Sequence, residues 1–124
     1  MAYTIKTILS FDKDFKRLFK RYQSLPADLK KFVSDLQRNP LLGTDLGGGV
    51  HKVRMAIKSK GRGKSGGARV ITYVDVIVEI EEGTVVLLAL YDKSDRETIS
   101  DAEIRDLMAE VGLWIEITPR CLKL

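Results

Sequence analysis

The spacing of the apolar residues changes near residue 50, and this change restricts the possible folds more than any other feature of the chain. Before that point, apolar side chains recur at the interval of an α-helix in two segments. After it, three runs have the composition of strands, at Val50–Lys58, Ala68–Ile80 and Thr84–Tyr91, and a weaker alternation over Tyr3–Leu9 predicts one more. Helices and strands that are segregated along a chain are typical of an α+β domain, here with a small antiparallel or mixed sheet.

The two helical segments are predicted to form an N-terminal helical hairpin. The first has an aromatic inner face that we assign to the core: Phe11, Phe15, Leu18, Phe19 and Tyr22. The second begins near Ser24 or Leu25, carries Pro26 in its first turn and ends before Pro40, because the residue preceding a proline is disfavoured in a helix. The connection between them is short, so the two helices are expected to run antiparallel.

The C-terminal helix has the clearest start signal in the chain. Ser100 and Glu103 have the spacing of a capping box, and Ile99 and Ile104 have that of a hydrophobic staple. The buried stripe that follows is expected to end at Gly112, where a helix end is favoured.

The length and composition predict one domain that covers residues 1–124. A chain of 124 residues with 44% hydrophobic content is long enough for one compact core. Cys121 is the only cysteine, which excludes an intramolecular disulfide, and His51 is the only histidine, which excludes a Cys/His zinc cluster. We expect no metal and no cofactor. No signal peptide is recognisable and no apolar run reaches the ~18 residues of a membrane span, so we expect a soluble, cytoplasmic protein without a membrane partner.

The positive charge is concentrated in one stretch of the chain. No acidic residue occurs from Leu46 to Val74, where seven of the 21 basic residues lie, whereas the rest of the chain is mildly acidic and the overall charge is +4. Such a patch is the footprint expected for a polyanion such as RNA. A solvated run of like charges without a partner is the alternative.

Strand parity separates these basic residues from the core. In the run that starts at Val50, alternate residues share a face, so the cationic row Lys52, Arg54 and Lys58 lies opposite the apolar residues and is expected to bind RNA. His51 falls on the apolar face. We therefore interpret His51 as a structural or rim residue, since a general acid or base in catalysis usually has a hydrogen-bonding partner.

A hairpin turn predicted at Glu81–Gly83 would bring the remaining basic residues together. It would pair the last two strand runs antiparallel, so that Arg69 meets Tyr91 and Lys93 at one end of the sheet. The glycine-rich segment before Arg69 adjoins the same end and carries further basic residues: Lys60, Arg62 and Lys64. Its glycines lack the spacing of a nucleotide-binding P-loop, and a strand follows them, so no nucleotide cofactor is implied.

This set of side chains suits one reaction, the cleavage of RNA by its own 2′-hydroxyl. The hydroxyl must lose a proton, the dianionic phosphorane must be stabilised and the leaving 5′-oxygen must gain a proton. Guanidinium groups bind phosphate oxygens bidentately, and a lysine among other cations can act as base or acid. A tyrosine can stack on a base or assist the leaving group. A surface that only binds nucleic acid, without chemistry, is equally compatible with the charge pattern.

The stretches "VHKVRMAIKSKGRGKSGGARVITYV" and "VVLLALYDKSDRETISDAEIRDL" resemble the RelE/HigB-like branch of the RelE/ParE superfamily of bacterial toxins from type II toxin–antitoxin systems. In that branch a "K-x-R" strand, a "KGKGK-x-GG-x-R" loop, a "V-I-Y-Y" strand and an "L-L-x-x-Y-x-K" strand recur in this order. The resemblance extends from Leu41 to about Leu113. It implies a small α+β fold like that of microbial ribonucleases.

The resemblance also implies a function and a set of site residues. The activity would be that of a metal-independent endoribonuclease that cuts mRNA in the ribosomal A site by attack of the 2′-hydroxyl, giving a cyclic phosphate and inhibiting translation. A cognate antitoxin would neutralise it, in some cases within a higher-order toxin–antitoxin complex. The positions that match the catalytic pattern are Arg69, Lys60, Arg62, Lys64, Tyr91 and Lys93. Relatives carry a further basic cluster and a tyrosine near residues 94–100, where this sequence has only Arg96.

Two other functions remain open at the level of the sequence. A ParE-like gyrase inhibitor would use the same fold as an interaction surface, although gyrase-poisoning members lack this basic set. A nucleic-acid-binding module on the same fold would bind with a steep dependence on salt but would not cleave.

Overall fold

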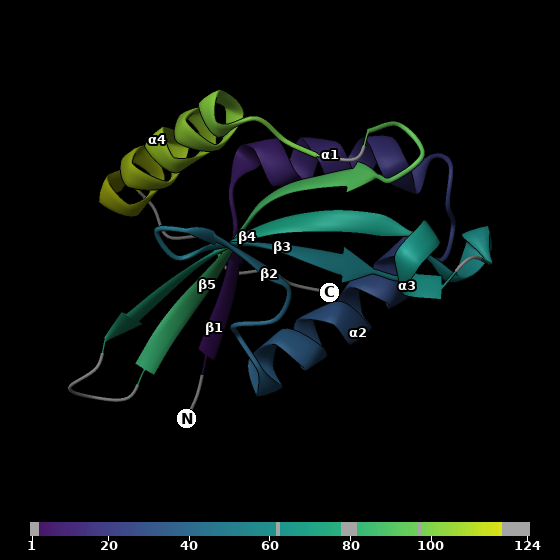
Figure 1. The fold of residues 1–124 in the computed structure, drawn as a ribbon, viewed down its shortest axis with the longest axis horizontal. Coiled ribbons are helices and arrows are strands. Elements are labelled where there is room, and N and C mark those ends of the chain that lie inside the picture. The colour runs from purple at the N-terminus through teal and green to yellow at the C-terminus, as the bar shows by residue number, and fades with distance from the viewer. Residues whose placement is uncertain (1–2, 62, 78–81, 97, 118–124) are drawn as a thin grey trace.

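The computed structural model describes residues 3–61, 63–77, 82–96 and 98–117 and confirms the α+β class (Figure 1). In chain order the elements are β1 (Tyr3–Thr7), α1 (Leu9–Phe19), α2 (Leu25–Arg38), β2 (Thr44–Gly47), β3 (Val50–Met55), the 3₁₀ turn η1 (Lys58–Lys60), α3 (Gly63–Gly66), β4 (Ala68–Ile77), β5 (Glu82–Asp92) and α4 (Asp101–Ile117). No helix in the described ranges is long and apolar enough to cross a membrane.

The five strands form one mixed sheet in the order β1-β5-β4-β3-β2. β1 runs parallel to β5, and every other neighbouring pair is antiparallel, as predicted for the β4–β5 hairpin. α1 lies beside β5, and α2 and α4 lie on opposite sides of the sheet (Figure 1). The core forms mainly between the sheet and the helical hairpin, where Leu18, Leu29 and Leu36 are almost completely buried.

The register of β3, β4 and β5 sorts the residues of the central strands into two faces. Val53 pairs with Val70, which pairs with Leu90, and all three are buried. One residue further along each strand, the side chains lie on the opposite face, because neighbours along a strand alternate. The parity predicted for β3 is confirmed: His51, Val53 and Met55 are buried, whereas Lys52 is half-buried and Arg54 is exposed.

Two boundaries in the basic region differ from the prediction. β3 ends at Met55 rather than Lys58, and the segment expected as a loop contains η1 and α3. Gly67 explains part of this difference: a Cβ there would lie 2.2 Å from the carbonyl oxygen of Met55, so the chain turns against the end of β3 at a place where only glycine fits.

Three other details of the prediction are corrected. β2 lies between α2 and β3, where the sequence analysis predicted no strand. Glu82 and Gly83 belong to β5 rather than to the turn, and the residues between Ile77 and Glu82 are outside the described ranges. α4 continues through Gly112 to Ile117, since one interior glycine costs a helix only about 1 kcal/mol.

The predicted start of α4 is confirmed. The Glu103 amide donates to Ser100 Oγ at 3.1 Å, and the Ser100 amide donates to Glu103 Oε1 at 3.4 Å, which completes the capping box.

Candidate functional site

Arg54, Arg69 and Tyr91 lie in line across three adjacent strands. Arg54 pairs with Arg69 between β3 and β4, and Arg69 pairs with Tyr91 between β4 and β5. Directly paired residues share a face of the sheet, so these three side chains leave the same surface. The antiparallel hairpin thus brings together Arg69 and Tyr91, as the sequence predicted.

A pocket of about 510 Å³ adjoins this row. Its lining includes the strand-side basic residues Lys52, Arg54, Arg69 and Lys93, and α2 contributes Asp28, Lys31, Phe32 and Asp35. The Lys93 amide donates to the Gly67 carbonyl at 3.1 Å, which ties the strand end that carries Lys93 to the glycine pair. Four of the predicted site residues therefore line one cavity that is large enough for a nucleotide.

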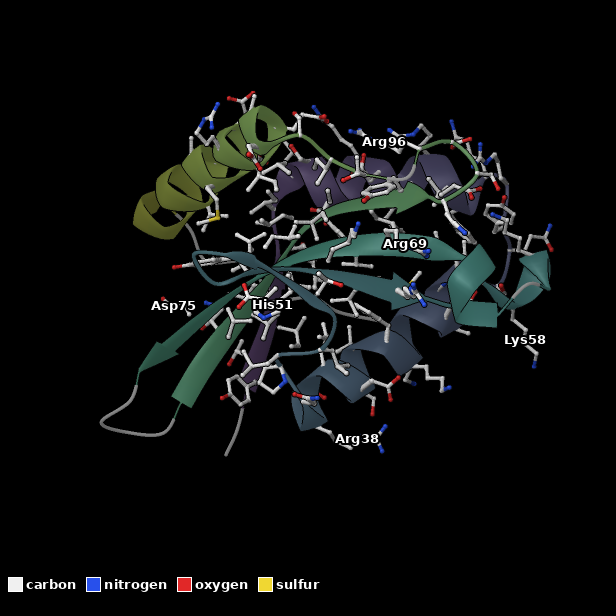
Figure 2. All side chains as sticks on the ribbon, viewed as in Figure 1. Arg38, His51, Lys58, Arg69, Asp75 and Arg96 are labelled. Carbon is white, nitrogen blue, oxygen red and sulfur yellow. The ribbon has the colours of Figure 1, made fainter. Side chains whose placement is uncertain are left out.

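Arg69 is a buried arginine, with 6% of its surface exposed. One guanidinium nitrogen donates to the Ala68 carbonyl at 3.1 Å (the side chain is marked in Figure 2). A guanidinium group held in a partly desolvated position interacts more strongly with a phosphate than one in water does. A guanidinium group in such a position can stabilise negative charge on a bound anion.

Tyr91 is also buried, and its hydroxyl has no hydrogen-bond partner among the described residues. Burial raises the pKa of this hydroxyl above its usual value. The group therefore keeps its proton near neutral pH and suits proton donation better than proton abstraction.

Arg96 covers Tyr91 and links it to α4. The Arg96 guanidinium carbon lies 5.2 Å from the centroid of the Tyr91 ring, and two of its nitrogens donate to the Glu103 carboxylate at 2.7 and 3.0 Å. The hydrogen bond from Arg96, together with the Ser100 amide, lowers the pKa of Glu103 to about 2. Arg96 thus holds the start of α4 next to Tyr91.

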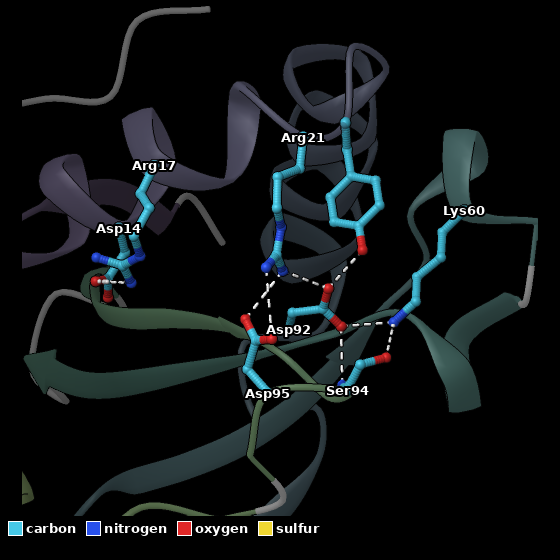
Figure 3. Close-up of polar contacts among 8 residues, drawn as sticks. Asp14, Arg17, Arg21, Lys60, Asp92, Ser94 and Asp95 are labelled. Carbon is cyan, nitrogen blue, oxygen red and sulfur yellow. Dashed lines mark hydrogen bonds and ion pairs between the residues drawn. The ribbon is translucent and has the colours of Figure 1, made fainter.

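Lys60 does not point into the pocket with the other basic residues. Its Nζ donates to Asp92 Oδ1 at 2.5 Å and to Ser94 Oγ at 2.7 Å (Figure 3). Asp92 also accepts hydrogen bonds from Arg21, at 2.6 Å, and Tyr22, at 2.5 Å. We call Asp92 with Arg21, Tyr22, Lys60 and Ser94 the Asp92 network.

Asp92 is the residue at this end of the sheet that the sequence analysis missed. Only 1% of its side chain is exposed. Burial alone would raise the pKa of Asp92, but hydrogen bonds from Lys60, Tyr22 and the Ser94 amide outweigh burial and hold it well below its usual range. No local pattern marks this residue, because Lys60 and Tyr22 are 32 and 70 positions away in the sequence.

The other predicted residues are more dispersed. Lys58 is exposed at the start of η1, and its side chain points away from Arg69 (Figure 2). Lys64 belongs to α3, and Arg62 is outside the described residues. His51 is buried on the core face, as the strand parity indicated.

A second pocket, of about 490 Å³, separates α1 from α4 beside β5. It differs from the first in charge, because acidic residues dominate its polar lining: Asp14, Asp92, Asp95, Glu103, Asp106 and Glu110, against Arg17 and Arg96. Within the described ranges, no group of three or more His, Cys, Asp or Glu side chains is arranged to hold a metal ion.

One comparison with known proteins bears on this arrangement. A family model described as the RelE toxin of the RelE/RelB toxin–antitoxin system matches residues 9–122. The match includes both N-terminal helices and all the basic residues of the candidate site.

Proposed function

The chain belongs to the RelE family of toxins from toxin–antitoxin systems, and from this premise we propose that it is an endoribonuclease that cuts mRNA on translating ribosomes and is neutralised by a cognate antitoxin. The observation that carries the proposal is the row of Arg54, Arg69 and Tyr91 beside a basic pocket. A cytoplasmic location follows from this proposed target.

In the proposed reaction, the 2′-hydroxyl of one nucleotide loses its proton to solvent and its oxygen attacks the adjacent phosphorus. A bond forms between the 2′-oxygen and phosphorus, the bond to the 5′-oxygen breaks, and a cyclic phosphate remains on the upstream fragment. Arg69 would stabilise the dianionic phosphorane, with Arg54 beside it. Tyr91 would donate its proton to the leaving 5′-oxygen, which fits a buried hydroxyl whose pKa is raised.

The charges around the site support RNA as the substrate. Lys52, Arg54 and Lys93 line the same pocket as Arg69 and would hold the phosphates that flank the scissile bond. Phosphates of the RNA backbone that lie further from the scissile bond would contact Lys58, Arg62 and Lys64. The acidic pocket between α1 and α4, which Tyr91 also lines, would repel RNA, so the strand would approach Tyr91 from the side of Arg69.

The proposal is tested by replacing Arg69 with alanine. Wild-type protein should arrest growth on expression and leave cut messages that primer extension detects, and Arg69→Ala should lower the cleavage rate by about 10² to 10³-fold. Arg38→Ala is the matched control, because Arg38 is an exposed arginine at the end of α2 that pairs with Asp35 and lies away from Arg69 (Figure 2).

Two outcomes would contradict the proposal. One is equal toxicity of the Arg69→Ala protein. The other is intact mRNA together with inhibited DNA supercoiling, which would indicate a gyrase inhibitor instead.

A further inference from the structure

We propose that Asp92 is a positioning residue of the RNA site, which acts through Lys60 to hold the glycine-rich segment Lys58–Gly67 against the end of β5. This inference rests on the proposed ribonuclease function and adds a residue to which no role has been assigned. It also changes the role expected of Lys60, from a group that touches RNA to an anchor.

The contacts of Asp92 use both carboxylate oxygens. Oδ1 accepts from Lys60 Nζ at 2.5 Å and from the Ser94 amide at 2.9 Å, and Oδ2 accepts from Arg21 and Tyr22 (Figure 3). A carboxylate that is 1% exposed and accepts four hydrogen bonds has a single favourable orientation. The network therefore joins the α1–α2 connection, η1 and the end of β5 at one point.

The position of Asp92 in the sheet makes this anchor relevant to the site. Asp92 pairs with Ala68, next to Arg69, and lies between Tyr91 and Lys93 in the sequence. A displacement of Asp92 would therefore be transmitted directly to the strand ends that carry the proposed reacting groups.

The segment that Asp92 anchors needs an external constraint. Gly61 and Gly63 both have positive φ angles, of 72° and 63°, and glycine-rich backbone loses much conformational entropy when it is ordered. At the end of β5, the segment is tied at Gly67 by the Lys93 amide and at Lys60 by Asp92. Its start is also held to the beginning of α2, because the Lys58 amide donates to Asp28 and the Ser59 amide donates to Ser24. Without the Lys60 contact, the start of the segment would stay fixed to α2, but its described ties to the end of β5 would be reduced to the one at Gly67.

Lys60 itself is poorly placed to bind RNA. Only 10% of its side chain is exposed, and its ammonium group already donates to Asp92 and Ser94. Contact with a phosphate would require the loss of both hydrogen bonds and would leave a buried carboxylate with one donor fewer. The side chain therefore contributes by fixing the backbone around it.

The experiment separates positioning from stability with a double-mutant cycle. The Asp92→Asn substitution removes the counterion of the buried Lys60 ammonium group, so this substitution should destabilise the protein. Adding Lys60→Met removes that charge with little change in volume, so the double variant should recover part of the lost thermal stability. Asp95→Asn is the matched control, because Asp95 binds the same Arg21 but is half exposed.

Each variant is assayed for single-turnover cleavage of mRNA on programmed ribosomes, at saturating toxin and well below its melting temperature. We expect Asp92→Asn and Lys60→Met each to lower the maximal rate by about 100-fold, because small displacements of positioned groups have effects of this size. The double variant should be no slower than the slower single variant and should not regain activity. Asp95→Asn should cleave at the wild-type rate.

Two results would overturn the inference while wild-type protein still cleaves. One is recovery of activity in the double variant in parallel with its stability, which would make Asp92 only a structural residue. The other is wild-type cleavage by Asp92→Asn. If wild-type protein itself does not cleave, the proposed function fails instead.

Discussion

Replacing Tyr91 with phenylalanine should make the protein more stable and less active. The Tyr91 hydroxyl is buried and has no hydrogen-bond partner in the part of the chain that the structure describes. A buried hydroxyl without a partner has lost its hydrogen bonds to water and has no protein hydrogen bond to replace them. Phenylalanine keeps the ring and its contact with Arg96 and removes only this oxygen.

The size of the effect follows from the desolvation of one polar group. An unsatisfied buried donor costs about 1 to 3 kcal/mol, and a small void left by the missing oxygen offsets part of the gain, so we expect a net stabilisation of about 1 kcal/mol. For a chain of 124 residues this corresponds to a rise in melting temperature of about 4 °C. The loss of a proton donor should lower the cleavage rate by about 100-fold.

Tyr22→Phe provides the matched control, because its hydroxyl does have a partner. Tyr22 donates to Asp92 Oδ2 at 2.5 Å, so its removal should destabilise the protein by about 1 to 2 kcal/mol. Thermal and urea unfolding followed by circular dichroism would give both stabilities, and single-turnover cleavage would give the rates.

The reasoning would be refuted by either of two results. If Tyr91→Phe is less stable than wild type by more than about 1 kcal/mol, the hydroxyl has a partner in solution. If Tyr91→Phe cleaves at the wild-type rate, the hydroxyl does not donate the proton.

Two other predictions concern charge. The folded-state pKa of Asp92 is lower than its unfolded value, so the Asp92 network stabilises the fold above about pH 4 and this contribution disappears as the pH falls through the folded pKa. Acid unfolding followed by circular dichroism should therefore show a shallower loss of stability below about pH 4 for Asp92→Asn than for wild type. Arg54→Ala should weaken RNA binding and reduce the slope of log K against log salt by about 1, as measured by fluorescence anisotropy, whereas an unchanged slope would mean that Arg54 does not contact a phosphate.

Features that depend on nearby residues were predictable from the sequence. The faces of β3 follow from alternation along the strand, and the start of α4 follows from Ser100 and Glu103, three positions apart. The pairing of Arg69 with Tyr91 followed from the antiparallel hairpin, even though Glu82 and Gly83 of the predicted turn belong to β5.

Features that depend on distant partners were not predictable. β2 consists of four exposed residues without an apolar alternation, and its pairing with β3 is what makes it a strand. The helical turns in the basic segment were missed because repeated glycines indicate a loop, whereas Gly67 packs against Met55 and bends the chain there.

The sequence by itself determined that this protein has one basic, acid-free region next to paired strands, because residue type and strand parity are local properties. The tertiary structure decided which of those charges act together. Arg54, Arg69 and Lys93 line one pocket, whereas Lys60, in η1, is neutralised by Asp92 at the end of β5. The physical reason is that the interaction energy of a charge depends on its distance from other charges and on its exposure to water, and folding sets both.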